Sequence, residues 1–125
     1  MTEQSGDPVT PTAFGIEKSQ TDQAVVLAVS GEVDMLAAPR LAEAIQTALA
    51  AGPPAVIVDL SKVDFLASAG MTVLVTANSQ VAPPTRFAVV ADGPATSRPI
   101  KLMGIDSVFP LYRTLDSALS SFAGE

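Results

Sequence analysis

Ser68 is the residue whose type and position offer the most chemistry in this chain. It lies in the sequence FLASAGM (residues 65–71), between an apolar segment typical of a strand and a segment with helical spacing. A helix N-terminus favours added negative charge, because its dipole and free N–H groups stabilise anions. A hydroxyl there therefore suits a phospho-acceptor, which would gain about −1.5 to −2 charges on modification. The simpler interpretation is a helix N-cap that contributes about 1 kcal/mol.

Hydrolytic and thiol chemistry are disfavoured. A nucleophile elbow has the pattern Gly-x-Ser-x-Gly, but Leu66 occupies the position of its first glycine. The chain contains no His, so it cannot assemble a Ser-His-Asp triad. It also contains no Cys, which excludes disulfides and thiolate metal ligands. We therefore expect a protein that is not an enzyme, with no catalytic residues, no metal site and no cofactor.

Two further groups of residues are candidate sites. Glu32 and Asp34 follow an apolar run, and paired carboxylates can bind a metal ion or act as acid and base. No other ligand-bearing motif lies nearby, so we favour a solvated turn in which Asp34 caps the next helix and contributes to a recognition surface. Ser97, Arg98 and Lys101 lie near another predicted helix start, where the simpler interpretation is two solvated cations on a short helix.

The composition is that of one compact domain. The 125 residues are 48% apolar and 16% charged, with a net charge of −6. The seven basic residues are scattered, so direct nucleic-acid binding is not expected. No apolar run reaches the roughly 20 residues that cross a bilayer. The N-terminal residues lack the features of a signal peptide. We expect a cytoplasmic location, with a flexible tail over residues 1–12 and the domain over residues 13–125.

Apolar runs and breakers predict alternating strands and helices. The expected strands lie at residues 14–18, 24–29, 55–60, 86–91 and 109–112. Residues 30–32 are expected to break the second strand, and residues 61–66 to form a connector. Helices are expected from about residue 39 to Gly52, from Ser68 or its neighbour to Pro83, from residue 95 to Gly104, and after a Thr114 cap.

The order of these elements predicts an α/β fold. Successive strand–helix units imply a mixed, mostly parallel sheet of about five strands with about four helices and right-handed crossovers. The first two strands would form a hairpin and add an antiparallel edge strand.

These motifs together resemble the STAS domain, and more narrowly the actinobacterial anti-sigma factor antagonists. The resemblance rests on Gly31-Glu32-Val33-Asp34, Val58-Asp59-Leu60, residues 65–71, and residues 98–105 followed by Phe109 and Leu111. It extends over about residues 14 to 123, nearly the whole chain.

The resemblance implies partner switching. The unmodified antagonist would bind an anti-sigma factor, often a serine kinase, and so free a sigma factor for transcription. Phosphorylation at Ser68 would break that complex, and a metal-dependent serine phosphatase would restore it. The implied partner-binding residues are Glu32, Asp34, Asp64, Ala67, Ser68, Ala69, Gly70, Met71 and Thr72.

The chain departs from the family pattern beside the acceptor. Ala67 stands where the family commonly has Asp, Ala69 replaces a second hydroxyl residue, and Met71 replaces Leu. An alternative function is a STAS adaptor or scaffold subunit outside sigma control, in which Ser68 is only a helix cap. A small nucleotide-dependent activity is a third alternative, which a nucleotide-binding titration would test.

Overall fold

The computed structural model describes residues 13–123, so the predicted flexible tail over residues 1–12 lies outside the described residues. A five-stranded sheet with the order β1-β2-β3-β4-β5 forms the centre of the molecule. The strands are β1 (Gly15–Gln20), β2 (Val25–Val33), β3 (Ala55–Leu66), β4 (Arg86–Val90) and β5 (Leu111–Tyr112). Strand β1 pairs antiparallel with β2, and all other pairs are parallel. The predicted mixed, mostly parallel sheet is therefore confirmed.

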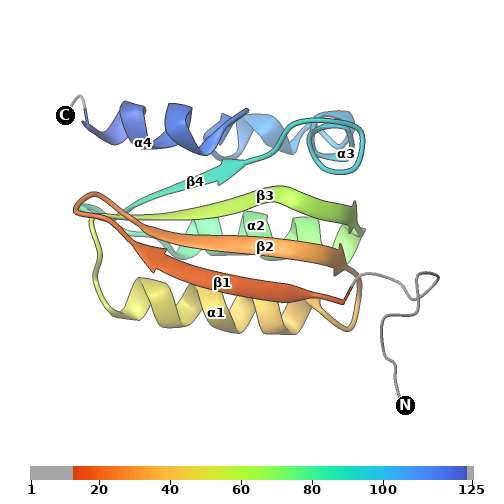
Figure 1. Ribbon diagram of the computed structural model, residues 1–125, viewed down its shortest axis with the longest axis horizontal. Coiled ribbons are helices and arrows are strands. Elements are labelled where there is room, and N and C mark those ends of the chain that lie inside the picture. Colours follow the sequence, from red (N-terminus) through yellow and green to blue (C-terminus); the bar gives the residue numbers. More distant parts are fainter. Residues whose placement is uncertain (1–12, 124–125) are drawn as a thin grey trace, which may run out of the picture.

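Helices cover both faces of the sheet. They are α1 (Ala38–Ala50), α2 (Ser68–Gln80), α3 (Ser97–Leu102) and α4 (Leu115–Ala123), with a short 3₁₀ turn, η1 (Ile105–Ser107). Helices α1 and α2 lie beside each other on one face, and α4 lies on the other (Figure 1). This arrangement explains the nearly continuous apolar runs in β2, β3 and β4, because both faces of these strands are buried.

The core has two parts, one on each face of the sheet. The larger part contains alternate residues of β2 and β3 together with Leu41 and Ile45 of α1 and Leu74 of α2. The smaller part lies beneath α4, whose Ala118 and Phe122 pack against the other alternate residues of β2, β3 and β4. The sheet is therefore packed against apolar side chains on both faces.

Strand β2 is longer than the sequence predicts. The expected break at residues 30–32 is wrong, because β2 continues to Val33. The pairing with β3 is irregular between Ala28 and Ser30 and again between Gly31 and Glu32. Gly31 has φ +81°, a conformation that glycine adopts readily and other residues rarely adopt. The glycine therefore marks a bulge inside the strand instead of its end.

Strand β3 also extends beyond its expected end. Residues 61–66, predicted as a connector, belong to β3 and remain paired with β2 as far as Leu66 opposite Val33. Four residues of this segment are exposed, namely Ser61, Lys62, Asp64 and Phe65, whereas Val63 and Leu66 are buried. Long-range pairing with β2 thus overrides the polar composition of the segment.

Several boundaries agree with the sequence. The Thr114 hydroxyl accepts a hydrogen bond from the N–H of Ser117 at 3.0 Å, which confirms the predicted cap of the last helix. Gly104, at φ +74°, follows α3 closely, as predicted. Within residues 13–123, no helix is long and apolar enough to cross a membrane.

Candidate functional site

The candidate site lies where β2 and β3 end. Val33 pairs with Leu66 at the last position of both strands. The backbone N–H of Ala67 then donates a hydrogen bond to the Val33 carbonyl oxygen at 2.9 Å. Because the strands are parallel, the residues that follow them, Asp34 and Ser68, emerge at the same edge of the sheet.

Ser68 is exposed and is the first residue of α2. The residue at the N-cap is Ala67, with an extended backbone (φ −79°, ψ 166°) and no side-chain cap. The sequence placed the helix start at Ser68 or its neighbour, and the N-cap is the neighbour, Ala67. The simpler interpretation of Ser68 itself as the cap is wrong, because Ser68 already lies inside the first turn. Within residues 13–123 the Ser68 hydroxyl has no hydrogen-bond partner, which leaves it available for chemistry. The first backbone N–H groups of a helix have no partner within that helix, so they favour an anion at this position.

Gly70 sets how closely α2 approaches the strand ends. A Cβ at Gly70 would lie 2.7 Å from Val33 Cγ1 and 2.8 Å from Leu66 Cδ1. Met71, the next residue, is only 9% exposed and belongs to the core. These two predicted partner-binding residues are therefore buried. They pack the start of α2 against the strand ends.

Asp34 organises the loop between β2 and α1. Its Oδ1 atom accepts hydrogen bonds from the N–H groups of Leu36 at 3.0 Å and Ala37 at 2.9 Å. Its carbonyl oxygen accepts a further bond from Ala38 N–H at 2.9 Å. The N-cap of α1 is Ala37, so Asp34 caps the turn before α1 and not the helix itself. This turn directs the next side chains outward.

The other predicted residues vary in exposure. Asp64 and Thr72 are exposed, whereas Glu32, Ala67 and Ala69 are half-buried. The Thr72 hydroxyl donates a hydrogen bond to the Ser68 carbonyl oxygen at 3.0 Å, within the first turns of α2. Across residues 13–123, no group of three or more acidic side chains is placed to hold a metal ion.

Several apolar side chains near the strand ends and at the end of α3 are exposed, and the sequence analysis did not single them out. Met35 (76% exposed) and Leu36 (84%) follow Asp34, and Phe65 (51%) lies near the end of β3. Leu102 (74%) and Met103 (63%) lie at the end of α3. A signal for the exposure of Met35 and Leu36 was present in the sequence, because both residues come before the helical apolar pattern of α1 begins. Neighbouring exposed apolar side chains mark protein interaction surfaces.

A small hollow lies beside Ser68. It has a volume of about 190 Å³ and is lined by Ser68, Met71, Thr72, Val75, Met103 and Ile105. Pockets for small molecules usually enclose roughly 300–1,000 Å³. This hollow is smaller, and its size suits a single side chain of a protein partner.

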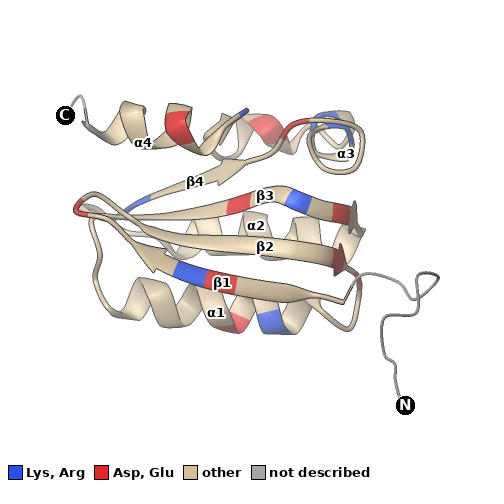
Figure 2. Ribbon diagram, in the orientation of Figure 1, with Lys and Arg blue, Asp and Glu red and all other residues tan. Residues whose placement is uncertain are grey.

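The third candidate, around Ser97, has a structural explanation. The Ser97 side chain is 8% exposed, and its hydroxyl exchanges hydrogen bonds of 3.0 Å with the N–H and carbonyl of Gly93. Arg98 and Lys101 are exposed, consistent with solvated cations. Figure 2 shows basic residues on α3 and acidic residues near the ends of β2 and β3.

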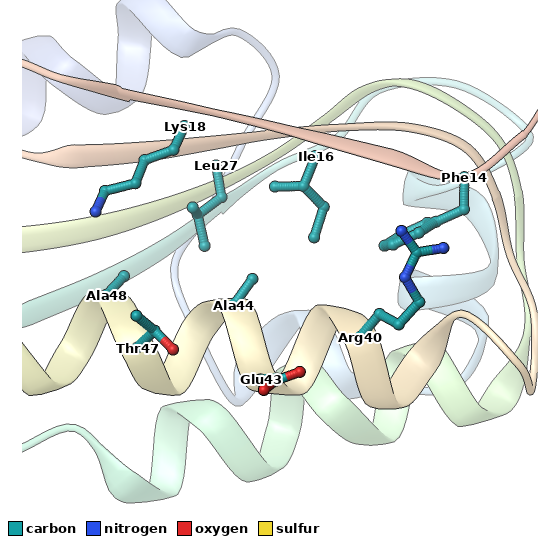
Figure 3. A pocket seen from close by; sticks show the side chains of 9 residues that line it. All are labelled: Phe14, Ile16, Lys18, Leu27, Arg40, Glu43, Ala44, Thr47 and Ala48. Atoms are coloured by element: carbon teal, nitrogen blue, oxygen red, sulfur yellow. The ribbon is translucent and has the colours of Figure 1, made fainter.

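A larger groove lies between β1 and α1 (Figure 3). Its volume is about 440 Å³, and Ile16, Leu27 and Ala44 line its apolar part. The Arg40 guanidinium lies over the Phe14 ring, 4.9 Å from the ring centroid. The groove shares no lining residue with the hollow beside Ser68.

The fold and this site define a small α/β domain that presents an exposed serine at the start of a helix. A family model described as the STAS domain matches residues 15–118. The chain therefore belongs to the STAS domain family, and the predicted resemblance is confirmed.

Two mycobacterial proteins are similar over most of the chain. Anti-sigma-F factor antagonist RsfB of Mycobacterium tuberculosis is 38% identical over 114 residues, which cover 91% of this chain and 93% of RsfB. The crystal structure of an anti-sigma factor antagonist from Mycobacterium paratuberculosis is 45% identical, with a TM-score of 0.85. That match covers 89% of this chain and 95% of the other.

A more distant structure shares the fold. The Bacillus cell fate determinant SpoIIAA in its phosphorylated form is 22% identical and has a TM-score of 0.63. The match covers 87% of this chain and 98% of SpoIIAA.

Proposed function

We propose that this protein is an anti-sigma factor antagonist: it binds an anti-sigma factor and so frees a sigma factor for transcription. The similarity to two mycobacterial antagonists, at 38% and 45% identity, supports this function. The structural observation that carries the proposal is an exposed Ser68, with an unengaged hydroxyl in the described structure, at the start of α2. The protein acts by binding and is not itself an enzyme.

The proposed contact area is named here the Ser68 surface. It consists of Glu32, Asp34, Met35, Leu36, Asp64, Phe65, Ala67, Ser68, Ala69, Thr72 and Met103. Exposed apolar side chains supply the area that a partner would remove from water, and the hollow beside Ser68 would receive one partner side chain. Gly70 and Met71 support this surface from below.

Phosphorylation of Ser68 is the proposed switch. Burial of the unmodified hydroxyl at an interface is compatible with binding, but a phosphate adds bulk and about −1.5 to −2 charges. Glu32, Asp34 and Asp64 lie at or near the ends of β2 and β3 and already make this edge acidic. The same phosphate is stabilised within the free protein by the N-terminus of α2. Modification should therefore abolish binding without unfolding the domain.

The proposed kinase is the anti-sigma factor itself, and a metal-dependent serine phosphatase restores the unmodified antagonist. Such an exchange, which uses ATP, would take place in the cytoplasm. Ala67 and Ala69 flank Ser68 with methyl groups, so neither adds a charge or a second hydroxyl beside the acceptor. Ser68 is then the sole acceptor at the start of α2.

A kinase assay tests the proposal. The full chain is incubated with ATP, Mg²⁺ and each candidate serine-kinase anti-sigma factor of the host, and intact mass and binding are measured before and after. We expect one added phosphate and loss of the complex for the wild type and for Ser79→Ala, a control at an exposed serine on the same helix. Ser68→Ala should bind but gain no phosphate.

The outcomes separate the two parts of the proposal. Binding without phosphate transfer would retain the antagonist function and remove the switch. Absence of both would favour the adaptor alternative.

A further inference from the structure

Within residues 13–123 the methionines differ sharply in exposure, and the exposed ones lie near the Ser68 end of the sheet. Met35 is 76% exposed and Met103 is 63% exposed, whereas Met71 is 9% exposed. Methionine is among the residues most often buried. Met103 lines the hollow beside Ser68, and Met35 follows Asp34 in the loop after β2. Two unusually exposed methionines therefore lie on the Ser68 surface.

Methionine suits a binding surface because its unbranched, polarisable thioether adapts to a partner. The same thioether reacts with oxidants when solvent reaches it. Oxidation converts a flexible apolar side chain into a polar, chiral sulfoxide. The chain has no Cys, so no thiol of its own competes for the oxidant.

We propose that Met35 and Met103 are oxidation sites, and that a hydroperoxide weakens binding at the Ser68 surface by converting them to sulfoxides. This inference rests on the proposed function. The thioether sulfur attacks one peroxide oxygen, the O–O bond breaks and an S–O bond forms. With hydrogen peroxide, the departing hydroxide takes the proton from the transferred oxygen and leaves as water. Sulfur loses two electrons, which reduce the peroxide.

The sulfoxide affects the complex more than the free protein. On the free surface the new S–O group stays hydrated, so the fold is retained. In the complex the sulfoxide oxygen would lose its hydrogen bonds to water, and the apolar contact offers no donor in their place. The affinity for the anti-sigma factor would therefore fall roughly tenfold. Met71 also lines the hollow but is only 9% exposed, so it should react more slowly with the oxidant. Methionine sulfoxide reductases reverse the modification.

The test uses the full chain and hydrogen peroxide. The oxidised protein is separated from peroxide, its sulfoxides are located by peptide mass mapping, and its affinity for the untreated anti-sigma factor is measured. We expect Met35 and Met103 to oxidise before Met71, a roughly tenfold loss of affinity, and recovery after reductase treatment. Circular dichroism should stay unchanged.

Leucine variants assign the effect to the two sites. The double variant Met35→Leu/Met103→Leu keeps apolar side chains of similar volume. Whatever its starting affinity, peroxide treatment should not lower that affinity. Met71→Leu, the matched buried control, should remain as sensitive as the wild type. Unchanged affinity of a wild-type chain carrying both sulfoxides would overturn the inference, as would equal oxidation rates for Met35, Met71 and Met103. If the untreated chain bound no anti-sigma factor, the proposed function would fail and the inference with it.

Discussion

Gly70 and Val33 lie so close together that a Cβ on Gly70 would be 2.7 Å from Val33 Cγ1. This contact joins the start of α2 to the end of β2. Since Val33 also accepts the hydrogen bond from Ala67, the backbone on either side of Ser68 is tied to the same strand end. The position of the exposed serine is therefore set by a glycine two residues further along the chain.

Gly70→Ala should destabilise the domain by about 1–3 kcal/mol, because the added methyl group overlaps Val33 and Leu66 in a packed core. Urea unfolding gives the value. The matched control is Gly15→Ala, whose new Cβ would meet only the Ser30 hydroxyl, at 3.1 Å. An equal loss for both variants would show that the close approach of α2 is not the cause.

Ser68→Asp should weaken binding of the anti-sigma factor at least tenfold and leave the far-UV circular dichroism unchanged. The carboxylate adds charge to an edge that already contains Asp34 and Asp64, while the α2 N-terminus stabilises it in the free domain. Titration calorimetry measures the affinity, and Ser79→Asp at the far end of α2 is the control. Equal affinities for wild type and Ser68→Asp would contradict a charge-based switch.

Asp34→Ala should destabilise the domain by about 1 kcal/mol, because the N–H groups of Leu36 and Ala37 lose their acceptor. Asp34→Asn keeps a carbonyl oxygen at that position and should retain most of the stability. Comparing the melting temperatures of the two variants separates the contribution of the turn's hydrogen bonds to stability from that of the carboxylate charge. A binding defect of Asp34→Asn without a matching loss of stability would assign the carboxylate charge to recognition.

Leu36→Ser should reduce partner affinity without a comparable loss of stability. The side chain is 84% exposed, so the free domain gains little from it, and surface substitutions usually change stability by no more than about 0.5 kcal/mol. Surface plasmon resonance measures the affinity and chemical unfolding the stability. Normal affinity of this variant would place Leu36 outside the contact area.

Ala44→Leu should stabilise the domain by about 0.5–2 kcal/mol, because the groove between β1 and α1 has room for the added carbons beside Ile16 and Leu27. Partner affinity should stay unchanged, since the groove shares no lining residue with the Ser68 hollow. Differential scanning calorimetry measures the expected gain in stability. A lower melting temperature would mean that the groove cannot accept the side chain without strain.

The amino-acid sequence by itself determined the local features. The apolar runs at residues 24–29 and 55–60 predicted strands buried on both faces, because only a sheet covered by helices on two sides needs no polar alternation. The position of Gly104 beyond α3 and the Thr114 cap were predictable because each depends on the backbone within a few residues. The location of Ser68 at a helix start was predictable for the same reason.

The tertiary structure decided the features that depend on distant partners. β2 and β3 extend to Val33 and Leu66 because each pairs with the other, and no local pattern encodes that pairing. The same pairing places α2 on the strand ends, so that Ala67, and not Ser68, occupies the N-cap. Met103 lines the hollow beside Ser68 because the residues that follow α3 lie beside α2. Such contacts depend on how whole helices and strands pack together, and a short sequence motif carries no information about that packing.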